Sequence, residues 1–184
     1  MNTKETAAVM DILSAAYPQF YRGMGPAEKK SAVTLWAGMF ADDPLQIVLA
    51  AVKRLIATDT KGFPPAIGAV KEQIWRIQNP QQLTEQEAWQ MVAKAVNTSN
   101  AERSFNELPP EVRQIVRSPV QLTEWGRMDE TAFQSVVASN FQRSFRARKE
   151  VEKERAKLPQ DVRRLEQAAT RALLMEALEG KDDA

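Results

Sequence analysis

The sequence predicts an all-α protein, and three observations predict it. Apolar residues recur at helical spacing along nearly the whole chain. No segment alternates apolar and polar positions strictly enough to propose a strand. Prolines and glycines interrupt the pattern at points where helices are expected to begin or end. We expect a small N-terminal module of about four helices, followed by a helical C-terminal region with a long charged helix.

The first expected helix runs from about Thr3 to Ala16. It ends at Tyr17-Pro18, because the residue before a proline is pushed out of helical geometry. A second helix begins at Pro26, since proline suits the first position of a helix, where its missing N–H would be unpaired anyway. The aromatic residues on the inner face of this helix are Trp36 and Phe40.

A third helix begins after Asp43-Pro44, where we expect the Asp43 carboxylate to accept the free N–H groups of the first turn. Phe63-Pro64-Pro65 then fixes an extended entry and starts a fourth helix, which ends at Asn79-Pro80. The residues expected in the core of this module are Trp36, Phe40, Val48, Val52, Ile67 and Ile74.

The C-terminal region opens with a capping box made by Thr84 and Glu87. Polar residues from Asn97 to Asn106 then predict a mobile linker. We therefore divide the chain into a helical module over 4–79, a helix and polar linker over 80–107, a helical region over 108–179 and an acidic tail over 180–184.

A short motif occurs twice, as Leu108-Pro109-Pro110-Glu111-Val112-Arg113 and as Leu158-Pro159-Gln160-Asp161-Val162-Arg163. A shared helix-start signal explains the likeness about as well as duplication does. Between the copies, a long helix is expected from about Asp129 to Lys157, and a final helix follows from about Asp161 to Leu178. The second half of the long helix is almost entirely charged, so we expect it to project into solvent.

The composition excludes several kinds of active site. The chain has no cysteine and no histidine, which removes thiol nucleophiles, the usual zinc sites and the commonest general base. It also lacks a glycine-rich phosphate loop. We expect no enzyme, no catalytic, cofactor-binding or metal-binding residues, and no cofactor. No apolar stretch is long enough to cross a membrane or serve as a signal peptide, so we expect a cytoplasmic protein without membrane partners.

A basic cluster in the long helix is the best candidate for nucleic-acid binding. With 25 Lys and Arg against 24 Asp and Glu, the chain as a whole has little excess charge for phosphates. Within the cluster, Phe141 and Phe145 alternate with cations that can engage phosphates, although both rings also fit the apolar stripe of the helix core. The cations of this cluster are Arg143, Arg146, Arg148 and Lys149.

Aromatic residues near the module edges are candidates for contact with a partner protein. Trp75 and Trp125 lie where an exposed tryptophan could act as a binding hot spot. The Phe63-Pro64-Pro65 turn is either a rigid helix entry or a preformed docking edge beside a loop.

One set of landmarks resembles a known family. Tyr17-Pro18-Gln19-Phe20, Leu35-Trp36 with Phe40, Ala50-Ala51-Val52 and Phe63-Pro64-Pro65-Ala66-Ile67 occur in this order and spacing. Together they resemble the phage-encoded loader and inhibitor of the replicative, DnaB-type helicase, over roughly residues 4–78. The resemblance implies a small non-enzymatic helical protein that binds the hexameric helicase, restrains it and delivers it to an origin-binding initiator protein. It also implies that protein partners, rather than DNA, are the main ligands.

Two other functions stay open at this point. One is a DNA-binding phage accessory protein that uses the basic cluster. The other is a structural phage protein that self-associates through the apolar stripe of the final helix. In the helicase hypothesis, we expect the helicase-binding determinant between about Leu108 and Leu178, with the N-terminal module as an initiator-facing or regulatory platform.

Overall fold

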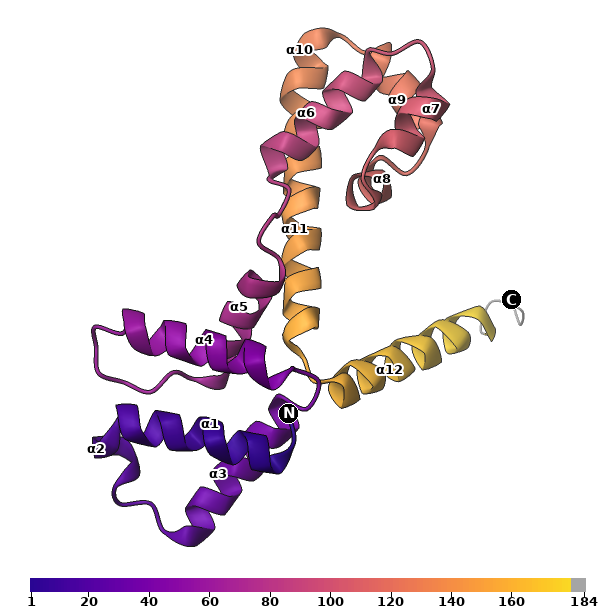
Figure 1. Ribbon diagram of the computed structural model, residues 1–184. Coiled ribbons are helices and arrows are strands. Elements are labelled where there is room, and N and C mark those ends of the chain that lie inside the picture. Colours follow the sequence, from indigo (N-terminus) through magenta and orange to yellow (C-terminus); the bar gives the residue numbers. More distant parts are fainter. Residues whose placement is uncertain (180–184) are drawn as a thin grey trace. The chain divides into compact units, whose positions relative to one another are not determined.

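The computed structural model describes residues 1–179, and every regular element in that range is helical (Figure 1). This confirms the all-α prediction. The chain divides into two compact units. The first consists of Met1–Pro80 together with the chain from Glu154 onward, and the second of Gln81–Lys153. Each unit has its own apolar core. The predicted acidic tail, residues 180–184, lies outside the described residues.

The first unit begins with α1 (Thr3–Ala16), whose bounds match the predicted helix. A capping box starts it: the Glu5 N–H donates to Asn2 Oδ1 at 2.9 Å, and the Asn2 N–H donates to Glu5 Oε2 at 2.8 Å. Pro18 ends α1 and is also the first residue of an additional short helix. The remaining helices of this unit are α2 (Pro18–Tyr21), α3 (Pro26–Met39), α4 (Leu45–Thr58), α5 (Ile67–Gln78) and α12 (Gln160–Glu179).

The core of the first unit lies between α1, α3, α4 and α5. Five of the six residues expected there are buried, and Ile67 lies half-buried at the edge of the core. The rings of Trp36 and Phe40 are in contact, with their centroids 5.2 Å apart. The buried apolar residues are Val9, Leu13, Tyr17, Trp36, Phe40, Val48, Ala51, Val52, Val70 and Ile74.

The predicted role of Asp43 as a helix cap is wrong. The N-cap residue of α4 is Pro44, and no side chain caps this helix. Instead, the Lys71 ammonium donates to Asp43 Oδ2 at 2.6 Å, and the Lys71 side chain is only 6% exposed. A buried ammonium without a counter-charge is far more costly than an uncapped helix end, so the pair takes the carboxylate.

The second unit contains α6 (Glu85–Val96), α7 (Ala101–Glu107), α8 (Pro110–Val116), α9 (Pro119–Gly126), α10 (Glu130–Ala132), the π-helical turn Phe133–Val137 and α11 (Ala138–Lys157), which continues past the end of the unit. Its buried apolar residues come from α6, α8, α9 and the run from Phe133 to Phe145, with Leu108 between α7 and α8. Trp89 is the centre of an aromatic cluster, 4.8 Å from the Phe133 ring and 5.7 Å from the Phe141 ring.

The predicted linker is largely helical. Asn100 caps α7, because its side-chain oxygen accepts the Arg103 N–H at 3.0 Å. Phe105 packs against the core, and Arg103 pairs with Glu107 one turn later. The polar composition suggested a loop, but one half-buried ring packed on the core and a good cap suffice to fix a short helix in a folded unit.

The long charged helix is present with one irregularity that the sequence did not predict. Asp129 caps its start by accepting the Ala132 N–H at 3.1 Å. The helical run then passes through the π-helical turn Phe133–Val137 before it continues as α11 to Lys157. A π-turn inserts one residue into the helical repeat and so shifts the face that the following residues present.

Candidate functional site

Two exposed aromatic rings meet on the first unit. Phe20, in α2, is 42% exposed, and Phe63, in the loop before α5, is 62% exposed. Their ring centroids are 5.3 Å apart. Large rings that stay accessible are common anchors of protein interfaces, because covering them removes much apolar surface from water. We call this pair of rings the Phe20–Phe63 edge.

The loop that carries Phe63 is held by the carboxylate of Asp59. The Lys61 N–H donates to Asp59 Oδ1 at 2.9 Å. This backbone hydrogen bond, with others from the Tyr17 hydroxyl and the N–H groups of Gly62 and Phe63, lowers the pKa of Asp59. Gly62 adopts φ 73°, which few other residues tolerate. These interactions therefore hold the loop, and Phe63 with it, in one conformation.

Tyr17 links this loop to the core of the first unit. Its side chain is 4% exposed, and burial, followed by the hydrogen bond to Asp59, raises the pKa of its hydroxyl. Gln19 adds a second tie, since its side-chain amide donates to the Gly62 carbonyl at 3.2 Å. Pro64 and Pro65 lie half-buried behind Phe63 and precede α5, which begins only at Ile67. The two prolines thus form a rigid entry to the helix rather than its first turn.

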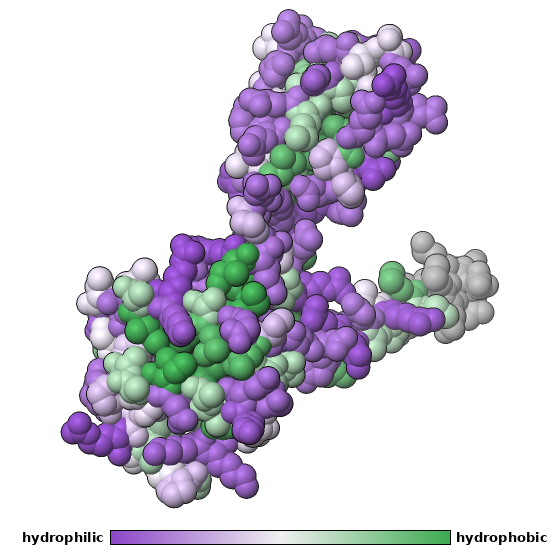
Figure 2. Space-filling model, viewed as in Figure 1, coloured by the Kyte–Doolittle hydropathy of each residue, from purple (hydrophilic) through white to green (hydrophobic). Residues whose placement is uncertain are grey.

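An apolar face also belongs to the first unit. Figure 2 shows hydrophobic side chains gathered over α4 and α5. Trp75 lies in α5, half-buried, and its indole N–H is buried without a hydrogen-bond partner among the described residues. The half-buried apolar residues of these two helices include Leu45, Leu49, Leu55, Ile56 and Ile77.

The last helix is attached at its start and exposed beyond it. The Gln160 N–H donates to Asp42 Oδ2 at 2.7 Å, so Asp42 caps α12. Just before the helix, the Lys157 ammonium lies 2.9 Å from Glu72 Oε2. Farther along, Leu165 is 71% exposed and Leu173 is 66% exposed. We call the apolar residues on this face the α12 stripe: Val162, Leu165, Ala169 and Leu173.

Three of the four cations in the basic cluster of α11 have hydrogen-bond partners in the second unit, although Arg146 and Arg148 remain exposed. Arg146 makes a bidentate contact with Glu85: its Nε donates to Oε1 at 2.6 Å, and its Nη2 donates to Oε2 at 2.5 Å. The hydrogen bonds from Arg146 lower the pKa of Glu85. The Lys149 ammonium donates to the Leu83 carbonyl at 2.5 Å and lies over the Phe145 ring. Arg143 is exposed.

Phe141 and Phe145 are 3% and 1% exposed, so both rings belong to the core and cannot stack on bases. The charged half of α11 is mainly exposed, as predicted, with none of residues 146–157 buried, although some of its cations also have partners. Arg146 and Lys149 each have a partner in the same unit, and Lys157 pairs with Glu72. The surface predicted for nucleic acid therefore lacks its aromatic component and part of its free charge.

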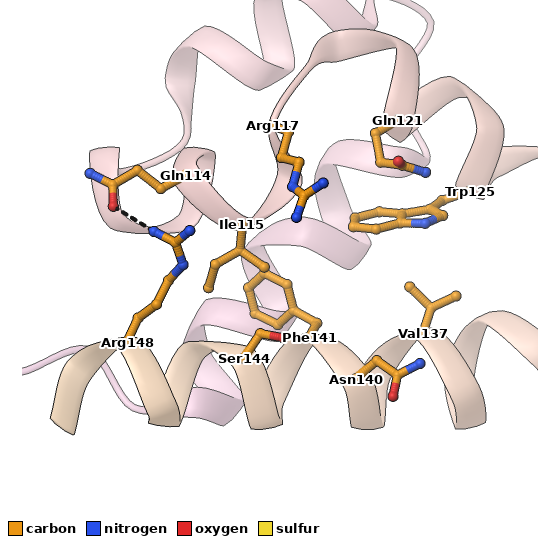
Figure 3. Close-up of a pocket in the computed structure, with 10 residues that line it drawn as sticks. All are labelled: Gln114, Ile115, Arg117, Gln121, Trp125, Val137, Asn140, Phe141, Ser144 and Arg148. Carbon is orange, nitrogen blue, oxygen red and sulfur yellow. Dashed lines mark hydrogen bonds between the residues drawn. The ribbon is translucent and has the colours of Figure 1, made fainter. Parts of the chain in front are cut away.

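Two further predicted contact residues come together elsewhere in the second unit. Trp125 is half-buried against the core, and it lines a groove together with Arg148 (Figure 3). The predicted aromatic contact residues thus lie in three places: the Phe20–Phe63 edge, the apolar face around Trp75, and this groove, which also contains Arg148. The other cations, Arg143, Arg146 and Lys149, are not in the groove lining.

Part of the first unit matches the sequence model of a known protein family. Residues 1–71 match the family model for the N-terminal domain of the phage helicase loader and inhibitor. The match covers less than half of the 184 residues and describes this segment alone. The match confirms the resemblance that the aromatic and proline landmarks indicate. No curated protein and no solved structure gives a match to the chain.

The matched loader domain contains α1 to α4, the loop held by Asp59 and the first residues of α5. The Phe20–Phe63 edge therefore lies entirely within it. Among residues 1–179, no group of three or more acidic side chains is placed to hold a metal ion. No helix in the described part of the chain is long and apolar enough to cross a membrane.

Sequence reasoning missed Phe20 of the edge and Asp59, which holds the loop that carries Phe63. Phe20 is a landmark in the sequence but not one of the predicted contact residues. Its place in a short connecting segment between Pro18 and Gly23 is the available signal, because such segments run over the surface. Asp59 looks like an ordinary loop residue. Its position three residues before Gly62 is the available signal, because an aspartate ahead of a left-handed glycine often organises the intervening turn.

Proposed function

We propose that this protein is an adaptor of phage DNA replication that binds a hexameric, DnaB-type replicative helicase. It inhibits the helicase and loads it at the origin through an origin-binding initiator protein. The helicase loader and inhibitor domain over residues 1–71 is the observation that carries the proposal. The adaptor acts by binding alone, without a cofactor, in the cytoplasm of a bacterial host.

The Phe20–Phe63 edge supports a role for the first unit in contacting the initiator. Both rings are exposed, and the Asp59 hydrogen bonds hold the Phe63 loop before any partner arrives. A preformed loop loses little conformational entropy on binding, so more of the contact energy appears as affinity. Pro64 and Pro65 act in the same direction, because they restrict the backbone next to Phe63.

The α12 stripe supports helicase binding by the C-terminal region. It is an amphipathic helix face whose leucines are open to solvent, and such faces dock into apolar grooves through residues spaced three or four apart. In the described part of the chain, Asp42 holds the beginning of α12, and Lys157, just before the helix, contacts Glu72. This division assigns the two ends of the chain to two partners.

Co-purification tests the proposal. The full chain is mixed with the cognate replicative helicase, with and without ATP, and passed over a sizing column. We expect a stable complex in at least one nucleotide state and lower DNA unwinding by the bound helicase. A folded chain that forms no complex in either state would remove the proposal.

A pair of variants separates the two surfaces. Phe20→Ala together with Phe63→Ala should weaken initiator capture and leave the helicase complex intact. Leu165→Asp should do the reverse. If both variants lose the same partner, the assignment of one surface to each partner is wrong.

Self-association is the second candidate, and the exposed leucines of the α12 stripe are the observation that favours it. Two such helices could pair along this face. Sedimentation at micromolar concentration distinguishes the two functions. A stable dimer that Leu165→Asp dissociates, with no helicase binding, would favour self-association over the adaptor.

A further inference from the structure

A groove in the second unit has features of a binding site that the adaptor proposal does not use. It has a volume of about 310 Å³ and lies where α8 and α9 face α11 (Figure 3). This is near the lower end of the size of ligand pockets, enough for one bulky side chain and its neighbours. The apolar side chains that line it are Ile115, Trp125, Val137 and Phe141.

The rest of the lining is polar and positively charged. Arg117 and Arg148 both line the groove, and no carboxylate does. Arg148 donates to a neutral partner, the side-chain oxygen of Gln114, at 3.1 Å, and this contact supplies no counter-charge. In contrast, the nearby Arg146 is neutralised by Glu85. The unit as a whole carries as many acidic as basic residues, so the uncompensated charge at the groove is a local feature.

Two departures from regular backbone geometry shape the groove. Arg117 adopts φ 71° and ψ −46°, and the Ser118 N–H donates to the Val116 carbonyl at 2.9 Å. This is a γ-turn with positive φ, which is rare and strained for a residue with a side chain. On the opposite wall, the π-helical turn ends at Val137 and sets the face of α11 that carries Phe141 and Arg148.

We infer that this groove binds an acidic segment of a partner protein, in which carboxylates flank one bulky apolar side chain. The apolar side chain enters between Trp125 and Val137, and the carboxylates pair with Arg117 and Arg148. Arginine suits this task because its planar fork matches a carboxylate. The side-chain amides of Gln114, Gln121 and Asn140 can hydrogen-bond to the peptide backbone.

The observations favour a peptide over single-stranded nucleic acid. A nucleic-acid strand needs a continuous row of free cations and accessible rings. Next to the groove, Arg146 and Lys149 are engaged within the unit, and Phe141 is buried. The inference needs only the second unit and does not depend on the helicase proposal.

Fluorescence anisotropy with labelled peptides tests it. The probes are fluorescein-labelled twelve-residue peptides with a Gly-Ser background and a central Asp-Glu-X-Asp, where X is Leu, Ile, Phe or Trp. Each has a matched Asn-Gln-X-Asn peptide. We expect at least one acidic peptide to bind the full chain with a Kd on the order of 10–100 µM. Its amide match should bind at least about tenfold more weakly.

Variants locate the site. Arg117→Gln and Arg148→Gln should each weaken binding of the acidic peptide by about fivefold or more. The matched controls Arg127→Gln and Arg143→Gln remove an exposed arginine of the same unit outside the groove and should change nothing. If Arg117→Gln fails to fold because of the strained turn, Arg148→Gln decides alone.

Three results would overturn the inference. The first is that no acidic peptide binds the folded chain more tightly than its amide match. The second is that the control variants weaken binding as much as the groove variants do. The third is that a twelve-nucleotide oligo-dT binds at the groove, with loss in Arg148→Gln, whereas the peptides do not.

Discussion

The helices α8 and α12 begin with the same sequence motif but differ in how far their apolar faces are buried. In both, the N–H of the motif leucine, Leu108 or Leu158, donates to the carbonyl three residues earlier at 3.2 Å. In both, the N–H of the motif arginine donates to the first proline carbonyl at 3.0 Å. Yet Val112 of α8 is fully buried, whereas Val162 of α12 is half-buried. The start of a helix is thus a local property, and the burial of its face is not.

The difference lies in the neighbours of each helix. α8 is enclosed in the core of the second unit, to which Val112 and Val116 contribute. The described contacts of α12 come from its first turn, where Asp42 accepts the Gln160 N–H and lies 3.6 Å from Arg163 Nη2. An amphipathic helix whose apolar face has no intramolecular cover is a candidate interface. On this comparison we propose that α12 is the helix that binds a partner.

The largest effect should come from a charge placed in α8. Val112→Asp puts a carboxylate into the core and should lower the free energy of unfolding by about 3–5 kcal/mol, or unfold the second unit. The matched variant Leu165→Asp in α12 should change it by less than about 0.5 kcal/mol. Urea denaturation followed by tryptophan fluorescence measures both. Equal losses in the two variants would mean that the α12 stripe is covered after all.

The next largest effect concerns helicase affinity. Leu165→Asp together with Leu173→Asp should weaken the complex by about 2–4 kcal/mol, because each leucine is expected to act as an interface anchor. Gln167→Asp is the matched control, since it adds the same charge on the opposite face of α12. Isothermal titration with the helicase gives both values. An effect of the control as large as that of the double variant would indicate general repulsion rather than a docking face.

A smaller effect should follow from removal of the α12 cap. Asp42→Ala leaves the Gln160 N–H without its acceptor and should cost about 1 kcal/mol. The loss should appear as faster amide exchange in the first turn of α12. Asp42→Asn retains an acceptor and should behave nearly as the parent chain does. No change in exchange on Asp42→Ala would show that the cap does not anchor the helix.

The smallest effect depends on pH. The hydrogen bond to Glu72 raises the pKa of Lys157 above its ordinary value of 10.5. Stabilisation from this pair is therefore complete below pH 10.5 and is lost as the pH rises through the folded-state pKa. Lys157→Arg should remove this step, because arginine stays protonated there. Urea denaturation between about pH 9.5 and pH 12 compares the two chains, and identical pH profiles would contradict the assignment.

Local signals predicted much of this fold. A helix start depends on residues within about one turn of each other, so a short stretch of sequence predicts it. This applies to Pro26, to the Thr84–Glu87 capping box and to the two Leu-Pro motifs. The sequence did not predict that Asp43 pairs with Lys71, because the two residues are 28 positions apart. The same limit explains the Arg146 contact with Glu85, which spans 61 positions and pairs one exposed cation of the apparent nucleic-acid cluster within its own unit.

The candidate surfaces were only partly predictable for a related reason. The neighbouring prolines mark Phe63 as an edge residue, but its contact with Phe20 depends on the packing of α2 beside the loop. The aromatic residues of α11 fit both a core and a binding face by spacing alone. Burial in the structure distinguishes a core ring from a surface ring. Phe145 is 1% exposed and belongs to the core, whereas Phe63 is 62% exposed and stays accessible.

Hydrogen exchange on the full chain, alone and mixed with the cognate helicase and ATP, tests the central claim that α12 is the helix that needs a partner. Amides of α8 should be protected in both samples. Amides from Arg164 to Met175 should exchange rapidly in the chain alone and at least about tenfold more slowly in the complex. A complex that forms while exchange in α12 stays unchanged would contradict the account.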